Sequence, residues 1–147
     1  MTEHGGAAPT SAQRWASEAH RRIEARGRDG LATILSEDFV QESRRGLGFR
    51  FDRQSVLGTV RSMRDLGMHI SGAPVAVAGD RCLLTRRAYA HGATVVELLA
   101  VSVWNEDGTL RRLVEFDVDD LDEALATLGE VSGGEPVRMV ASPGDPL

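Results

Sequence analysis

Two oppositely charged residues, Arg86 and Glu97, interrupt otherwise apolar, β-rich runs and are the strongest candidates for chemistry. The runs lie within 81–104 and are separated by the turn sequence His91-Gly92. If those two residues form the loop, Arg86 faces Glu97 across the strand pair. A charge removed from water needs a partner, so this pairing is physically sensible. In the functional interpretation Glu97 is a general base and Arg86 holds a ligand oxyanion. In the structural interpretation the pair only fixes the strand register.

Three further residues carry side chains suited to acid–base or anion-binding work. Glu42 and Arg44 share a face with Val40 on an expected strand, and they either extend the polar cluster or are simply exposed at the strand end. His69 begins the strand after the third expected helix and is either an acid–base group or a structural histidine. The other histidines lie in the N-terminal segment, a helix and a turn, so the sequence predicts no metal site.

The composition is that of one globular domain with an acidic balance. The chain has 147 residues, of which 41% are hydrophobic and 27% charged, and its net charge is −5. This balance argues against a nucleic-acid partner, because nucleic-acid-binding surfaces are basic. All 17 basic residues are arginine, which excludes chemistry that needs a lysine, such as Schiff-base formation. Arg45, Arg50 and Arg53 form a local basic cluster that is either an anion site or a solvated patch.

No segment resembles a targeting signal, a membrane span or a familiar catalytic motif. No apolar run approaches the roughly 20 residues that cross a bilayer. The first residues lack a basic region followed by an apolar stretch, so we expect a cytoplasmic protein without a membrane partner. Motifs typical of serine hydrolases, metalloproteases, nucleotide-binding domains and thiol-redox proteins are absent.

Periodicity and turn residues predict one α+β domain over 10–130, between flexible segments at 1–9 and 131–147. A capping box at Thr10 and Gln13 begins the first helix. A short second helix and a strand over 38–43 follow, and Asp52 caps a third helix. Four consecutive strands and a last helix complete the domain.

The four strands are expected at roughly 68–78, 81–90, 93–104 and 109–116. The last helix is expected to be capped by Asp117. Residues 137–140 are compatible with an additional edge strand, but the tail interpretation is preferred.

The hairpins of this meander define two sheet faces. With Asp107-Gly108 as the second turn, Leu99 faces Phe116. The more apolar face is expected to be concave, and it carries Cys82, Leu84, Arg86, Val95, Glu97, Leu99, Val101, Val114 and Phe116. The other face mixes aromatic, aliphatic and arginine side chains, which suits a dimer interface. It carries Leu83, Thr85, Arg87, Tyr89, Val96, Leu98, Trp104, Arg111, Leu113 and Glu115.

Several stretches together resemble the nuclear transport factor 2-like superfamily, specifically small actinobacterial members of its SnoaL-like branch. The stretches span about 10–130 of the chain. The most specific is DGTLRRLVEFDVDDLDEAL, because a glycine turn, a strand, a phenylalanine and an acid-rich helix follow in fixed order. The others are Trp15 in the first helix, DFVQESRRGLG at 38–48, Asp52-Arg53 and Glu97.

The resemblance implies a cone-shaped α+β barrel, in which a curved antiparallel sheet has helices packed on its concave face and a pocket between the two. It also implies a homodimer, commonly formed through the outer sheet face. It does not imply one activity, because the superfamily contains isomerases, cyclases, epoxide hydrolases, dehydratases and non-catalytic modules. The Tyr-plus-Asp set of ketosteroid isomerases has no clear counterpart, since Tyr89 is expected on the face opposite Glu97. The expected pocket residues are Trp15, Phe39, Arg44, Leu84, Leu99 and Phe116.

Two hypotheses follow. In the first, the protein is a cofactor-free dimer that holds a small, largely apolar molecule and possesses proton-transfer activity such as isomerisation, cyclisation or epoxide opening. Glu97 would accept the proton, Arg86 would stabilise negative charge, and Glu42 or His69 would assist. In the second, it is a non-catalytic ligand-binding or regulatory dimerisation module. An open cavity containing Glu97 would favour the first hypothesis.

Overall fold

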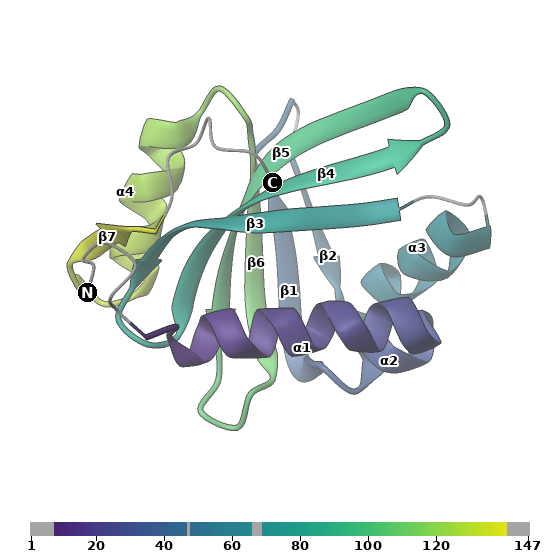
Figure 1. Cartoon of the computed structure of the whole chain (residues 1–147), viewed down its shortest axis with the longest axis horizontal. Helices are drawn as coiled ribbons and strands as arrows, with labels where there is room; N and C mark the ends of the chain where they lie inside the picture. The colour runs from purple at the N-terminus through teal and green to yellow at the C-terminus, as the bar shows by residue number, and fades with distance from the viewer. Residues whose placement is uncertain (1–7, 47, 66–68, 141–147) are drawn as a thin grey trace.

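The chain forms a curved seven-stranded sheet with helices on both faces (Figure 1). The structure is a computed structural model that describes residues 8–46, 48–65 and 69–140, with the backbone alone for 60–65 and 69. The elements are α1 (Ser11–Arg26), α2 (Arg28–Ala32), β1 (Leu35–Ser43), β2 (Phe49–Asp52), α3 (Arg53–Asp65), β3 (His69–Ala78), β4 (Cys82–His91), β5 (Thr94–Trp104), β6 (Leu110–Asp117), α4 (Leu121–Val131) and β7 (Val137–Met139).

The strand order across the sheet is β2-β1-β6-β5-β4-β3-β7. The meander from β3 to β6 is antiparallel, as expected, while β1 lies parallel to β6 and makes the sheet mixed. This parallel contact joins the N-terminal half of the domain to the meander. The predicted α+β class and cone-like curved sheet are confirmed.

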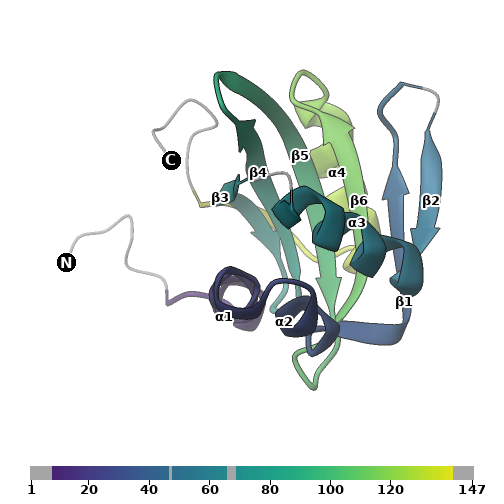
Figure 2. The same ribbon diagram turned by 90° about the vertical axis from the view of Figure 1, so that its right-hand side faces the viewer.

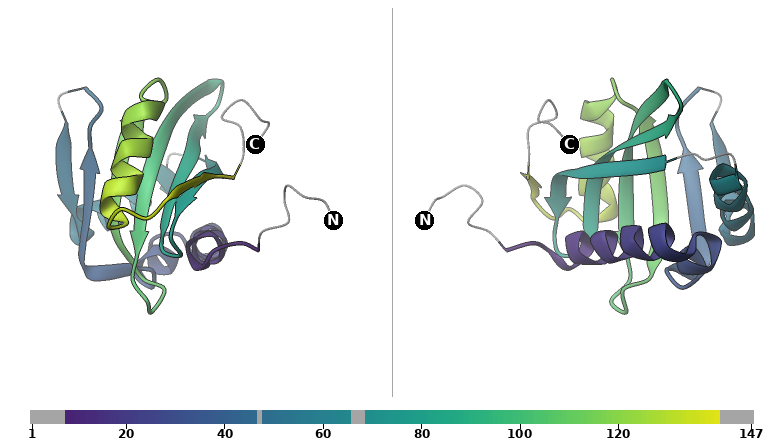
Figure 3. Two further views of the ribbon diagram at one scale, coloured as in Figure 1. Left: turned by 90° about the vertical axis from the view of Figure 1, so that its left-hand side faces the viewer. Right: turned by 45° about the vertical axis from the view of Figure 1, so that its right-hand side comes forward.

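The helices divide between the two faces of the sheet. Helices α1, α2 and α3 cover one face, while α4 lies on the other (Figures 2 and 3). The core under α1–α3 contains Leu83, Leu98 and Leu113 from the sheet. The core under α4 contains Leu84, Leu99, Val101, Val114 and Phe116.

The expected identity of the two faces is therefore wrong. The face expected to be concave, with Leu84, Leu99 and Phe116, packs against α4. The face expected to form a dimer interface, with Leu83 and Leu98, is the one that α1–α3 cover. Apolar content did not distinguish the faces, because helices cover both.

The first helix is anchored by the capping box at its N-terminus and by the contacts of its tryptophan. Its capping box forms as predicted: Gln13 N–H donates to Thr10 Oγ1, and Thr10 N–H donates to the Gln13 side chain at 2.8 Å. The ring centroids of Trp15 and Trp104 are 6.2 Å apart. Gly108, in the β5–β6 turn, lies against the same Trp15 ring. These contacts hold α1 across the lower end of the sheet.

Strand register was predicted correctly for one hairpin and missed by two residues for the other. In β5–β6, Leu99 pairs with Phe116, as expected. In β4–β5, His91 pairs with Thr94, so the loop is Gly92-Ala93 rather than His91-Gly92. Glycine at the first loop position, with φ +61°, is what a type II′ hairpin turn requires. A shift of two residues leaves every side chain on its expected face.

The segment after α4 returns to the sheet. Residues 137–139 form β7, which pairs antiparallel with β3 at the sheet edge. The edge-strand interpretation was thus the better one for this part of the segment expected to be a tail. The ends of the chain, 1–7 and 141–147, lie outside the described residues. Among the described helices, none has the length and apolar composition needed to cross a bilayer.

Candidate functional site

A buried glutamate and the only tyrosine of the chain meet on the sheet face that α1–α3 cover. Glu115 is 5% exposed, on β6. The Tyr89 hydroxyl, from β4, lies 3.4 Å from Glu115 Oε2 and donates to it. This distance is long for an O–H···O bond, so the carboxylate is only weakly satisfied. Among the described residues, no arginine or histidine forms an ion pair with Glu115.

The sheet itself brings the two side chains together. Strand β5 separates β4 from β6, and its residue opposite Glu115 is Ala100. Tyr89 pairs with Val96 of β5, so its side chain reaches Glu115 diagonally across that strand. Ser43, which is also buried, lies beside Glu115 on the parallel neighbour β1. Three elements distant in sequence thus supply polar groups to one place.

The surroundings of this polar group are apolar. Tyr89 packs against the core cluster under α1–α3. Other buried members of that cluster come from β1, α3 and the sheet: Phe39, Leu57, Leu83, Leu98 and Leu113. A few polar groups within apolar walls are the usual composition of a site for a small organic molecule.

Burial raises the pKa of Tyr89 above its ordinary value of 10.0. The nearby Arg87 cation opposes this rise, and the Glu115 carboxylate adds to it. Tyr89 therefore keeps its proton at neutral pH and remains a hydrogen-bond donor. A neutral phenol beside a carboxylate offers a ligand one donor and one acceptor, or a place to leave a proton.

The Arg86–Glu97 pair forms, but on the other face. Arg86 Nη2 lies 2.6 Å from Glu97 Oε1, and Arg86 Nε donates to the same oxygen at 2.8 Å. The residues are diagonal rather than directly opposite, since Arg86 pairs with Leu99 and Glu97 with Ala88. The side chains are 23% and 39% exposed, and Glu97 lies in the half of the hairpin nearer to its turn. They are separated by the sheet from Tyr89 and Glu115.

The six expected pocket residues are divided between the two faces. Trp15 and Phe39 belong to the core under α1–α3. Leu84, Leu99 and Phe116 are buried in the core under α4. The Arg44 guanidinium lies 5.5 Å from the centre of the Phe116 ring.

Glu42 joins a network of arginines on the α4 face. Its Oε2 accepts from Arg44 Nε at 3.0 Å, and its Oε1 accepts from Arg112 Nη2 at 3.1 Å. The hydrogen bond from Arg44 is the main reason that the pKa of Glu42 is lowered. Arg44 also donates to Thr127 of α4 at 3.3 Å. The network connects β1, β6 and α4.

His69 begins β3, as expected from the sequence, and its backbone pairs with Ala90. Its side chain lies outside the described part of the chain. No group of three or more potential metal-ligating side chains occurs among the residues that the structure describes.

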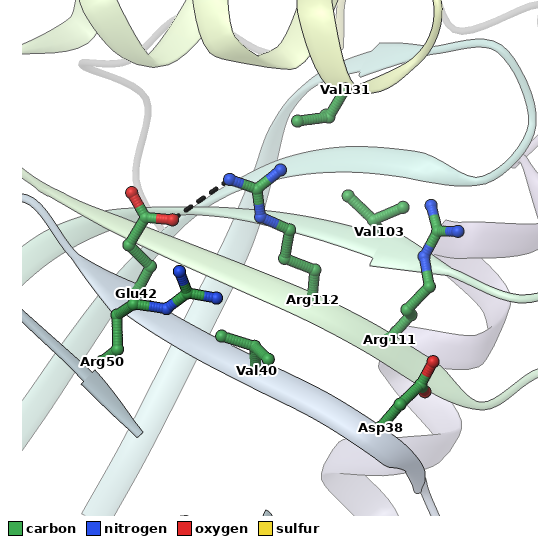
Figure 4. Close-up of a pocket in the computed structure, with 8 residues that line it drawn as sticks. All are labelled: Asp38, Val40, Glu42, Arg50, Val103, Arg111, Arg112 and Val131. Atoms are coloured by element: carbon green, nitrogen blue, oxygen red, sulfur yellow. Dashed lines mark hydrogen bonds and ion pairs between the residues drawn. The ribbon is translucent and has the colours of Figure 1, made fainter. Parts of the chain in front are cut away.

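A hollow of about 360 Å³ opens on the α4 face, beside the end of α4 (Figure 4). Its walls combine Val40, Val103 and Val131 with charged side chains of β1, β2 and β6. Glu42 and Arg112 border it and are joined by the hydrogen bond drawn in Figure 4.

The comparisons with solved structures recognise this architecture at low sequence identity. An LEH-like epoxide hydrolase from Mycobacterium tuberculosis is 19% identical, with a TM-score of 0.57, over 88% of this chain and 99% of that one. A SnoaL-like family protein from Agrobacterium tumefaciens is 12% identical, with a TM-score of 0.55, over 72% of this chain and 96% of that one. The chain has the nuclear transport factor 2-like fold.

A third protein with the nuclear transport factor 2-like fold has been solved with a ligand. RV0760c from Mycobacterium tuberculosis, in complex with estradiol-17beta-hemisuccinate, is 11% identical with a TM-score of 0.58, over 73% of this chain and 93% of that one. No family model and no curated protein matches the sequence. The solved structures thus confirm the resemblance to SnoaL-like proteins at the level of the fold.

Tyr89 and Glu115 were not among the predicted site residues, although a signal for them was present. Glu115 stands in the apolar run LVEF, just as Glu97 stands in VVELLA. The alternation already placed Tyr89 and Glu115 on one face. What the sequence did not show was that α1–α3 would cover this face.

Proposed function

We propose that the protein binds a small, largely apolar molecule between α1–α3 and the sheet, with Tyr89 and Glu115 as its polar contacts. The observation that carries this proposal is the weakly satisfied, buried Glu115 carboxylate beside a tyrosine hydroxyl in an apolar environment. The Tyr89 hydroxyl would donate to a ligand oxygen, and Glu115 would accept from a ligand hydroxyl. The ligand complex of RV0760c, which shares the fold, supports the choice of an apolar ligand with oxygen groups.

Ligand titrations of matched variants test the proposal. The probes are estradiol-17beta-hemisuccinate and a panel of apolar ketones, followed by calorimetry. Tyr89→Phe removes one donor and is expected to weaken binding about five-fold, the effect of one neutral hydrogen bond of about 1 kcal/mol. Glu115→Gln replaces a charged acceptor by a neutral amide and is expected to weaken binding about ten-fold, because hydrogen bonds to charged groups contribute about 1.5–3 kcal/mol. Glu97→Gln is the control, because it changes a glutamate on the opposite face.

The variants also distinguish this site from the Arg86–Glu97 site predicted from sequence. Weakening by Glu97→Gln, with unchanged binding in Glu115→Gln, would transfer the site to the α4 face. Equal binding by all variants would contradict both sites. Circular dichroism of each variant, recorded first, shows that the fold is retained.

A second candidate function, proton-transfer catalysis, is favoured by the absence of an ion pair at Glu115 among the described residues. A carboxylate that no arginine holds has its oxygens available to accept a proton from a ligand. In this function Glu115 removes a proton next to a ligand carbonyl, while Tyr89 donates to the oxygen that becomes negative. No cofactor is needed for such a step.

Proton transfer can be detected before the natural substrate is known. A bound ketone in D₂O should exchange its α-protons for deuterium, which NMR follows. Glu115→Gln is expected to abolish exchange above the buffer rate, and Glu97→Gln to preserve it. Binding without exchange would instead indicate the alternative, a non-catalytic ligand-binding or regulatory module.

We further propose a cytoplasmic homodimer. The face predicted from sequence is buried under α1–α3, so it is not available to a second copy. Light scattering on the purified full chain measures the assembly, and a monomer at all accessible concentrations would contradict the proposal.

A further inference from the structure

The hollow on the α4 face has features of a second binding site, separated by the sheet from Tyr89 and Glu115. Three arginine side chains, Arg50, Arg111 and Arg112, border it from β2 and β6 (Figure 4). Val40, Val103 and Val131 supply an apolar surface between them. The volume of about 360 Å³ suits a molecule of a few heavy atoms.

A break in strand register brings two consecutive arginines to this hollow. Val103 pairs with Arg112 and Trp104 pairs with Leu110, which leaves Arg111 as an extra residue on β6. In a regular strand Arg111 and Arg112 would point to opposite faces. At a β-bulge two neighbouring residues oppose one, and a side chain can be redirected. The result is a local concentration of positive charge in an acidic protein.

The arginines are not all neutralised by protein carboxylates. Glu42 accepts hydrogen bonds from both Arg44 and Arg112, so its two oxygens are engaged. Within the described part of the chain, the guanidinium groups of Arg50 and Arg111 have no hydrogen-bond or ion-pair partner. Against the acids Asp38 and Glu42, the lining carries an excess of one positive charge, three arginines minus two acids.

We propose that this hollow binds a small organic carboxylate with a short apolar chain. A guanidinium group matches a carboxylate geometrically and donates two parallel hydrogen bonds to it. Arg111 supplies these donors at one end of the hollow, while Arg50, at the other end (Figure 4), and Arg112, which remains bonded to Glu42, add positive charge. The valines cover the apolar part of the ligand. A bare phosphate would use the arginines but would leave the valines uncovered.

NMR titration of the full chain with hexanoate tests the proposal. We expect saturable shifts in the amides of 38–42, 50, 103, 111–112 and 131, with a dissociation constant on the order of 1 mM. Arg111→Gln should weaken binding about ten-fold, because charge-assisted hydrogen bonds are lost. Arg50→Gln should weaken it less, because it removes only a nearby positive charge. Arg138→Gln, which removes an exposed arginine at the opposite sheet edge, should leave the constant unchanged.

Three control ligands, acetate, hexanol and inorganic phosphate, separate the contribution of the apolar chain from that of the negative charge. Each should bind at least ten-fold more weakly than hexanoate, since acetate and phosphate lack the chain and hexanol lacks the charge. Equal affinity for phosphate and hexanoate would overturn the assignment, as would equal weakening by Arg138→Gln. Shifts confined to Tyr89, Glu115 and their neighbours would also overturn it, because hexanoate would then occupy the other face.

Discussion

Two glutamates occur in similar apolar strand sequences, but they differ in burial and in their partners. Glu97 and Glu115 both interrupt runs of β-branched and aliphatic residues. Glu97 pairs with an arginine in the half of a hairpin nearer to its turn, and its side chain is 39% exposed. Glu115 is buried and has a tyrosine as its hydrogen-bond donor. The predicted ion pair is real, but burial makes Glu115 the better candidate for ligand contact.

Tyr89 permits a direct measurement of its environment, because no other tyrosine and no lysine is present. Burial raises its pKa, so the midpoint of tyrosinate absorbance at 295 nm should lie above pH 10 in the folded protein. The raised pKa stabilises the fold fully below the unfolded value of about 10. That stability is lost as the pH rises through the folded pKa, since the unfolded chain releases the proton first.

Tyr89→Phe should therefore reduce the slope of the unfolding free energy against pH above pH 10, measured by urea unfolding. The buried Cys82 thiol also has a raised pKa, and its contribution remains in the variant as an internal reference. Tyrosinate absorbance with an ordinary midpoint near 10 would mean that the hydroxyl reaches water, and it would remove Tyr89 from the proposed site.

At the scale of elements, turns and caps were predictable where one local interaction decides them. The Thr10 capping box and the Asp52 cap, whose carboxylate accepts from Ser55 N–H at 2.9 Å, are confirmed. Asp117 was predicted to cap the last helix, but its carboxylate pairs with Arg45 instead, and α4 begins at Leu121. The competing arginine comes from a loop 72 residues away, which local sequence does not show.

Gly108, in the β5–β6 turn, combines a positive φ with close packing against Trp15, so its substitution should destabilise the fold. Its φ is +86°, and an added Cβ would lie 3.0 Å from Trp15 Nε1. Gly108→Ala should lower the unfolding free energy by about 2–3 kcal/mol, through backbone strain plus displacement of Trp15. Denaturant unfolding followed by tryptophan fluorescence measures this change.

Gly92→Ala provides the matched control for that measurement. Gly92 also has a positive φ, +61°, but nothing lies within 4 Å of an added Cβ. It should therefore show only the backbone cost of about 1 kcal/mol. Equal losses in both variants would mean that the Trp15 contact adds nothing to the stability.

At the scale of the whole molecule, sequence predicted the element order and the curved sheet but not how the helices divide between its faces. Alternation correctly grouped Leu84 with Leu99 and Leu83 with Leu98. Both groups are apolar, so composition favoured neither as the face under α1–α3. That choice depends on long-range contacts, such as Trp15 with Gly108, that no local pattern contains. The predicted pocket residues are divided between the two faces for this reason.

The two cores share one sheet, and this predicts that they unfold together. Leu128 of α4 is completely buried on one face, while both tryptophans lie in the core on the other. Leu128→Ala should cost about 2–5 kcal/mol by leaving a cavity. If the domain is cooperative, tryptophan fluorescence should report this loss at the same denaturant midpoint as far-ultraviolet circular dichroism.

Val95→Ala, at a 58% exposed position, is the control and should change neither midpoint. A fluorescence midpoint that stays at the wild-type value while the dichroism midpoint falls would show that α4 and its core unfold separately, because the strands would then hold α1–α3 without α4.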